Sequence, residues 1–116
     1  MASINYDNRY FVGKINYDSG DFTREVVFRY RQKDRVVWGS FEGGRVLHGN
    51  FVAKVLDDDS LDMVWQYLNK DGVLRRGTCR SQPEVLPDGR LRLNESWECT
   101  GDDGESGTST IEEIGG

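Results

Sequence analysis

The chain has 116 residues, with 20 acidic and 15 basic side chains and a formal net charge of −5. A chain of this length forms one domain with a core of its own, so we expect a single domain over residues 1–116. No apolar run approaches the roughly 20 residues of a membrane-spanning helix, and the start of the chain lacks the apolar core of a signal peptide. These features predict a cytoplasmic protein that has no membrane partner.

The charged and sulfur-containing residues argue against several classes of partner. An acidic protein repels the phosphate backbone at long range, so we expect no nucleic-acid partner. The two cysteines, Cys79 and Cys99, lack the paired spacing of a zinc site and are expected to be reduced thiols. The acidic turns at 57–62 and 102–105 lack the ligand spacing of a calcium loop. We therefore predict no metal and no cofactor.

Turn residues recur every ten to fifteen positions along the chain, as is typical of short strands joined by hairpins. Eight strands are predicted, over residues 9–16, 23–32, 35–42, 45–56, 61–69, 73–86, 90–100 and 107–114. Closure of such a chain removes both exposed sheet edges. The predicted fold is therefore all-β, an eight-stranded antiparallel up-and-down β-barrel, whose interior holds side chains or one small ligand.

Strand alternation and turn length together predict which side chains face the interior of the barrel. Side chains alternate between the two faces of a strand, and the partners of one hairpin share a nearly constant index sum. A tight turn at residues 43–44 pairs Glu42 with Arg45, which sets Trp38 beside Gly49 on the inner face. The candidate ligand-binding residues on this face are aromatic, hydroxyl-bearing, thioether or acidic: Tyr30, Trp38, Ser40, Met63, Trp65, Tyr67, Ser81, Glu95 and Trp97.

Glu95 interrupts an inner row that is otherwise mostly apolar. A carboxylate inside a barrel must be paired, protonated or in contact with water or ligand, unless it lies at the rim or a bulge turns it outward. The aromatic side chains either line a cavity or fill the barrel. Gly49 and Gly77, opposite aromatic residues, favour a cavity. The turn at residue 87 sets Cys79 against either Cys99 or Trp97, depending on its length.

Five segments of the chain carry a family resemblance. They are residues 37–44 (VWGSFEGG), 61–67 (LDMVWQY), 77–84 (GTCRSQPE), 95–97 (ESW) and 110–114 (TIEEI). Together they resemble a family of small bacterial proteins, avidin-like or lipocalin-like in fold, whose members are sometimes named N-acetylglutamate synthase. The resemblance covers nearly the whole chain and implies a small β-barrel; it implies no catalytic residues.

Three functions remain, and the residues rank them. The first is a non-enzymatic barrel that binds a small apolar or aromatic ligand through its tryptophans, with the tyrosines, Ser81 and Glu95 orienting it. The second is a structural or interaction module with a filled barrel, acting as a homo-oligomer such as a homodimer. An enzyme is third, because the sequence offers no nucleophile–base pair, and His48, the only histidine, is predicted to face solvent. An acetyltransferase would also need a pyrophosphate-binding loop that opens a helix.

Overall fold

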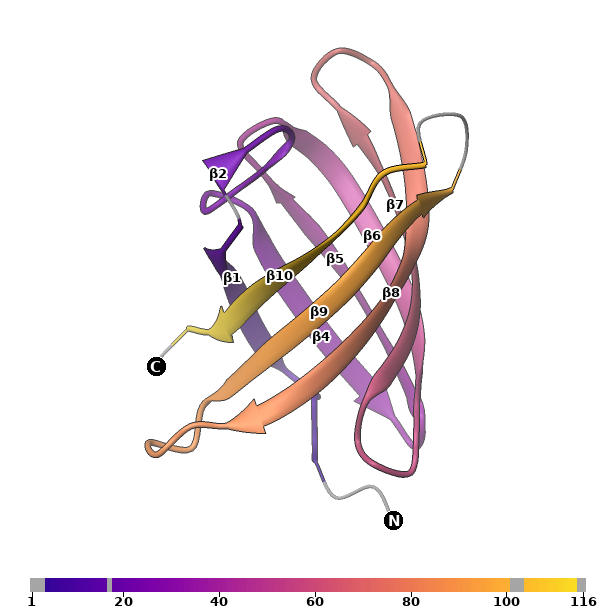
Figure 1. Cartoon of the computed structure of the whole chain (residues 1–116). Coiled ribbons are helices and arrows are strands. Elements are labelled where there is room, and N and C mark those ends of the chain that lie inside the picture. Colours follow the sequence, from indigo (N-terminus) through magenta and orange to yellow (C-terminus); the bar gives the residue numbers. More distant parts are fainter. Residues whose placement is uncertain (1–3, 17, 101–103, 115–116) are drawn as a thin grey trace.

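The structure is a computed structural model that describes residues 4–16, 18–100 and 104–114. Part of the acidic turn at 102–105 therefore lies outside the described residues. Eight strands close into a barrel in the order β1-β10-β9-β8-β7-β6-β5-β4, and every neighbouring pair is antiparallel (Figure 1). They are β1 (Arg9–Ile15), β4 (Val27–Lys33), β5 (Val36–Gly43), β6 (Val46–Val55), β7 (Leu61–Asn69), β8 (Leu74–Val85), β9 (Leu91–Thr100) and β10 (Ser106–Glu113).

The predicted fold class is confirmed, with one addition between the first two barrel strands. The described residues include no helix, and hence none long and apolar enough to cross a membrane. A small hairpin, β2 (Asp18–Ser19) and β3 (Phe22–Thr23), pairs only with itself and lies at one end of the barrel (Figure 1). The second predicted strand began too early for this reason, since β4 starts at Val27.

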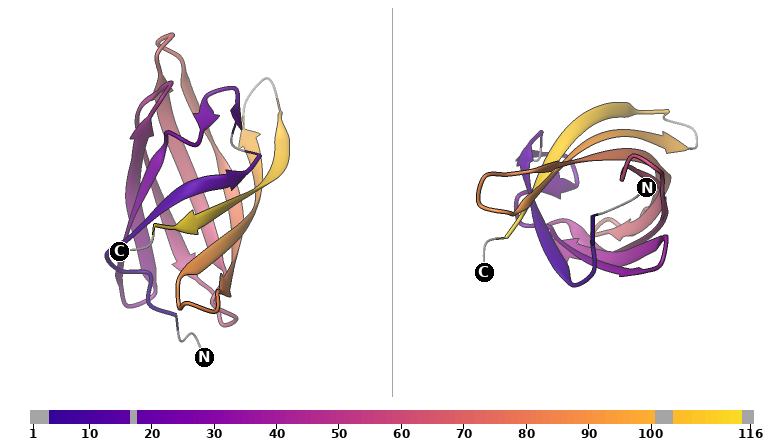
Figure 2. Two further views of the ribbon diagram at one scale, coloured as in Figure 1. Left: turned by 90° about the vertical axis from the view of Figure 1, so that its left-hand side faces the viewer. Right: turned by 90° about the horizontal axis from the view of Figure 1, so that it is seen from below.

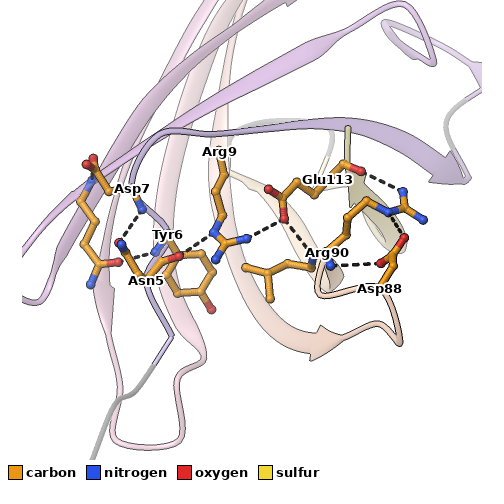
Figure 3. Close-up of polar contacts among 9 residues, drawn as sticks. Asn5, Tyr6, Asp7, Arg9, Asp88, Arg90 and Glu113 are labelled. Atoms are coloured by element: carbon orange, nitrogen blue, oxygen red, sulfur yellow. Dashed lines mark hydrogen bonds and ion pairs between the residues drawn. The ribbon is translucent and has the colours of Figure 1, made fainter. Parts of the chain in front are cut away.

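The N-terminal segment covers the opposite end of the barrel (Figure 2). Tyr6 is completely buried there, and its hydroxyl donates a hydrogen bond to the Asp59 carbonyl oxygen at 2.6 Å. Arg9 joins this segment to the last strand, because its guanidinium donates to the Asn5 carbonyl at 2.6 Å and to the Glu113 carboxylate at 2.7 Å (Figure 3). These contacts fix the segment against the strands and exclude water from that end.

Aliphatic side chains fill the barrel interior next to this covered end. Leu61 and Leu91 are the first residues of their strands there, and both are at most 2 % exposed. The other fully buried members of this filled end are Phe11, Val37, Leu93 and Ile111. This part of the interior forms a packed core.

The register of β5 and β6 corrects two of the predicted inner positions. The hairpin pairs Gly43 with Val46, but a register shift follows, so that Phe41 pairs with Gly49. The predicted tight turn without a bulge gave the opposite face to β5. Trp38 and Ser40 therefore point away from the interior, and Trp38 is 40 % exposed. Their expected inward placement is wrong.

The remaining strands follow the predicted alternation. Between β8 and β9 the index sum is constant at the value that sets Cys79 opposite Trp97, so the two cysteines are not cross-strand partners. Both are buried and free. His48 is exposed on the outer face, as predicted.

Candidate ligand-binding cavity

A cavity of about 640 Å³ occupies the half of the barrel that faces the β2–β3 hairpin. Its volume lies within the range of pockets that bury small organic ligands, roughly 300–1,000 Å³. Its walls are largely aromatic, and polar side chains lie at its mouth and on its floor. The aromatic and sulfur-containing lining comprises Phe22, Phe28, Tyr30, Phe41, Phe51, Met63, Trp65, Tyr67, Cys79, Trp97 and Cys99.

The aromatic rings of the walls lie over glycines of the adjoining strand. Trp65 pairs across strands with Gly77, and a Cβ atom added at Gly77 would lie 2.4 Å from the indole. The same relation joins Phe41 with Gly49 and Trp97 with Gly107. Because glycine has no side chain, each ring lies flat on the wall and does not cross the lumen.

The indole of Trp65 is additionally fixed by a hydrogen bond. Its Nε1–H donates to the Thr78 carbonyl oxygen at 3.1 Å. An indole that is both seated on a glycine and hydrogen-bonded to the backbone has one orientation. The wall at Trp65 is therefore rigid.

The β2–β3 hairpin places one ring over the mouth of the cavity. Phe22 packs edge-on against Tyr67, with 5.0 Å between ring centroids, and lies 5.7 Å from Phe41. Phe22 is part of the cavity lining and is only partly buried. The hairpin thus narrows the opening.

Asp21 anchors this hairpin to the barrel. Its Oδ2 accepts hydrogen bonds from the Tyr67 hydroxyl and the Asn69 amide, both at 3.0 Å, and Arg45 lies 3.3 Å from Oδ1. Burial raises the pKa of Asp21, but the hydrogen bonds from Asn69, Tyr67 and Arg45 together outweigh burial and hold it below its usual range. Asp21 is therefore an anion that accepts from three donors at the mouth.

The other charges at the mouth also form ion pairs. Arg45 pairs with Asp71 as well as with Asp21. Arg75 lies 3.8 Å from the Glu105 carboxylate. The mouth is polar and close to charge balance.

Glu95 lies on the floor of the cavity and is 9 % exposed. The Ser109 hydroxyl donates to its Oε1 at 3.3 Å, and the Cys79 thiol is 3.9 Å from its Oε2. Burial raises the pKa of Cys79, and the nearby Glu95 raises it further. Cys79 therefore remains a protonated thiol, which can donate to the carboxylate but is a poor nucleophile.

Ser81 is the cross-strand neighbour of Glu95 and is completely buried. Its Oγ has no hydrogen-bond partner among the residues that the structure describes. Ser81 lies outside the cavity lining. It belongs to the packed interior beneath Glu95.

The structure brings most of the predicted site residues together. Six of the nine predicted side chains line the cavity: Tyr30, Met63, Trp65, Tyr67, Glu95 and Trp97. Ser81 is buried next to them, whereas Trp38 and Ser40 face outward. Contact of any of these side chains with a ligand stays a prediction.

Sequence reasoning missed three features of the cavity. Phe41 was assigned to the outer face because the register shift in the β5–β6 hairpin was not foreseen. Phe22 and Asp21 lie in a segment that was interpreted as a turn, and strand alternation carries no signal for such residues. Within the described part of the chain, no group of three His, Cys, Asp or Glu side chains is arranged to hold a metal ion.

Comparison with known proteins identifies the family. No curated protein matches the chain, and no solved structure matches it. A family model described as avidin-like protein matches residues 4–114, which include every strand of the barrel. This match does not extend to the name N-acetylglutamate synthase, which is not shown. With its closed eight-stranded barrel and a match over nearly its whole length, the chain belongs to the avidin-like protein family.

Proposed function

We propose that this protein binds a small apolar or aromatic ligand inside its barrel. The observation that carries the proposal is the cavity of about 640 Å³, which is walled by aromatic rings and open to solvent at one end. Aromatic faces hold flat or apolar groups, and a few polar side chains fix their orientation. Membership of the avidin-like family supports a barrel that binds a small ligand.

The proposed role is binding and not catalysis, in the cytoplasm. The cavity thiol of Cys79 is buried, and its pKa is raised, so it does not supply a thiolate nucleophile. The carboxylate of Glu95 accepts a hydrogen bond from Ser109 at 3.3 Å, which suits it to orient a bound group.

Intrinsic fluorescence tests the proposal, because the three tryptophans differ in position. Trp65 and Trp97 line the cavity, whereas Trp38 is on the outer face. A Trp38→Phe variant leaves emission from the cavity alone. A panel of small aromatic and apolar compounds should change the emission of this variant and raise its unfolding temperature.

Two controls make the fluorescence result specific. The change in emission should shrink in a Trp65→Phe, Trp97→Phe double variant, in which only the outer Trp38 remains. The proposal is wrong if the panel shifts neither the emission nor the unfolding temperature of Trp38→Phe, or if only the outer tryptophan responds.

A second candidate function, self-association, is favoured by an apolar row on the outer face. Trp38 pairs across strands with Val52, and Val52 pairs with Val64. These three side chains, the outer apolar row, are 40 %, 54 % and 57 % exposed. Exposed apolar patches with polar surroundings mark interaction surfaces, and a two-fold dimer brings one such patch against its copy.

Sedimentation velocity at micromolar concentration tests this second candidate. A dimer that forms through the outer apolar row should dissociate in a Trp38→Lys variant. Leu74→Lys is the matched control, because Leu74 is 79 % exposed and lies outside that row. A monomeric wild-type protein, or a dimer that survives Trp38→Lys, would contradict this function.

A further inference from the structure

The charges that line the cavity are divided between its mouth and its floor. Four carboxylates and two guanidinium groups belong to the lining. Three of the carboxylates are at the mouth, where Arg45 pairs with Asp21 and Asp71, and Arg75 pairs with Glu105. The fourth carboxylate is that of Glu95, on the floor. The lining as a whole therefore has an excess of negative charge.

The surroundings of Glu95 make that charge effective toward a ligand. Trp97 is two residues from Glu95 on the same inner row of β9, and Tyr30, Met63 and Trp65 also line the cavity. Carboxylates in apolar surroundings exert stronger electrostatic fields than carboxylates in water. The faces of aromatic rings carry partial negative charge as well and attract cations. The floor and the walls therefore favour a positive group over a neutral or negative one.

The two side chains that contact the Glu95 carboxylate are neutral donors. Ser109 Oγ lies 3.3 Å from Oε1 and Cys79 Sγ lies 3.9 Å from Oε2. Both distances are longer than a strong hydrogen bond to a carboxylate, which is typically about 2.7–2.9 Å for a cationic nitrogen donor. A ligand ammonium would form the shorter and stronger contact.

We propose that the ligand of this cavity is an amine, whose protonated nitrogen donates to Glu95 and whose apolar or aromatic body lies between the rings of the walls. This inference rests on the proposed ligand-binding function and specifies its chemical class. The aromatic walls supply the contact area, and the Glu95 carboxylate selects for charge and direction.

Calorimetric titration with three ligands of one shape tests the inference on the wild-type protein. The probes are 1-naphthylmethylamine, 1-naphthylmethanol and 1-naphthylacetate, which share a ring system and differ in charge. The amine should bind roughly tenfold or more tightly than the alcohol, as expected for a charge-assisted contact in a buried site. The carboxylate should bind most weakly.

Two variants on strand β9 assign the effect to Glu95. Glu95→Gln keeps the shape and the acceptor oxygen but removes the charge, so the preference for the amine over the alcohol should fall to about twofold or less. Glu98→Gln is the matched control, because Glu98 is on the outer face of the same strand and exposed. Its preference should equal that of the wild type.

The possible outcomes separate the two proposals. If the alcohol or the carboxylate binds as tightly as the amine, the amine inference is wrong, while binding in the cavity stands. If none of the three probes binds, both proposals fail. The comparison among ligands needs no variant, so it decides the inference even if Glu95→Gln does not fold.

Discussion

Replacing Gly77 with alanine tests whether the barrel needs a residue without a side chain beneath Trp65. A Cβ atom at this position would lie 2.2 Å from the Glu98 carbonyl oxygen and 2.4 Å from the Trp65 ring. An ordinary contact begins at 3.4 Å, so the carbonyl oxygen would have to retreat by 1.2 Å. That oxygen belongs to the backbone of β9, where a shift of this size disturbs the hydrogen bonds between β8 and β9.

The expected loss of stability follows from these contacts. Overpacking of a buried site costs about 1–3 kcal/mol, and a lost hydrogen bond adds about 1 kcal/mol. The Trp65 bond to the Thr78 carbonyl oxygen is the one at risk, since the ring must move. Alanine restricts the unfolded chain, which offsets roughly 0.4–1 kcal/mol. Gly77→Ala should therefore lower the free energy of unfolding by about 2–3 kcal/mol.

Urea unfolding of Gly77→Ala and Gly107→Ala provides the measurement and its control. The three atoms nearest to an added Cβ at Gly107 all belong to the Trp97 ring, at 2.8–3.4 Å. Trp97 is only partly buried and can move, so Gly107→Ala should lose less than about 1 kcal/mol. Equal losses in the two variants, or a Gly77→Ala protein as stable as the wild type, would refute the reasoning.

Two further predictions concern the two ends of the barrel. Asp21→Asn should lower the free energy of unfolding by about 1–2 kcal/mol at neutral pH. Burial raises the pKa of Asp21, but its hydrogen bonds lower it further, so its stabilisation is present above about pH 4 and lost as the pH falls; the two proteins should converge in acid, and a constant difference would contradict this. Tyr6→Phe removes the bond to the Asp59 carbonyl oxygen and should cost about 1–2 kcal/mol in urea unfolding. Tyr10→Phe, at a residue that is 45 % exposed, should change stability by less than about 0.5 kcal/mol, and equal effects would argue against a role for the Tyr6 hydroxyl.

Sequence reasoning predicted the fold because alternation and turn spacing repeat along most of the chain. Strands β7, β8 and β9 keep a constant register, so the inward positions of Trp65, Cys79 and Glu95 follow from counting by two. The β5–β6 hairpin breaks that count with a register shift near its turn. A bulge that moves the register by one residue exchanges the two faces of a strand. Trp38 was therefore placed inside, although it is on the outer face.

The lid over the cavity was outside the reach of local patterns for a different reason. The β2–β3 hairpin has two residues in each strand, too few for a period of two to appear. Asp21 is held by Tyr67, which is 46 positions away in the chain. A contact over that distance depends on the closed barrel, so the segment could be interpreted only as a turn.

The barrel has room for a ligand because its two halves pack their side chains differently. An eight-stranded barrel is just wide enough for its interior side chains to meet, so a cavity requires wall residues that do not extend across the lumen. In the filled end, side chains such as Leu61, Leu91 and Leu93 point across it and meet. In the cavity end, the rings that pair with glycine lie flat along the wall instead: Phe41 on Gly49, Phe51 on Gly39, Trp65 on Gly77 and Trp97 on Gly107. All four rings line the cavity. The pairing of aromatic residues with glycine on neighbouring strands is therefore the feature of this sequence that converts a filled barrel into one with a binding site.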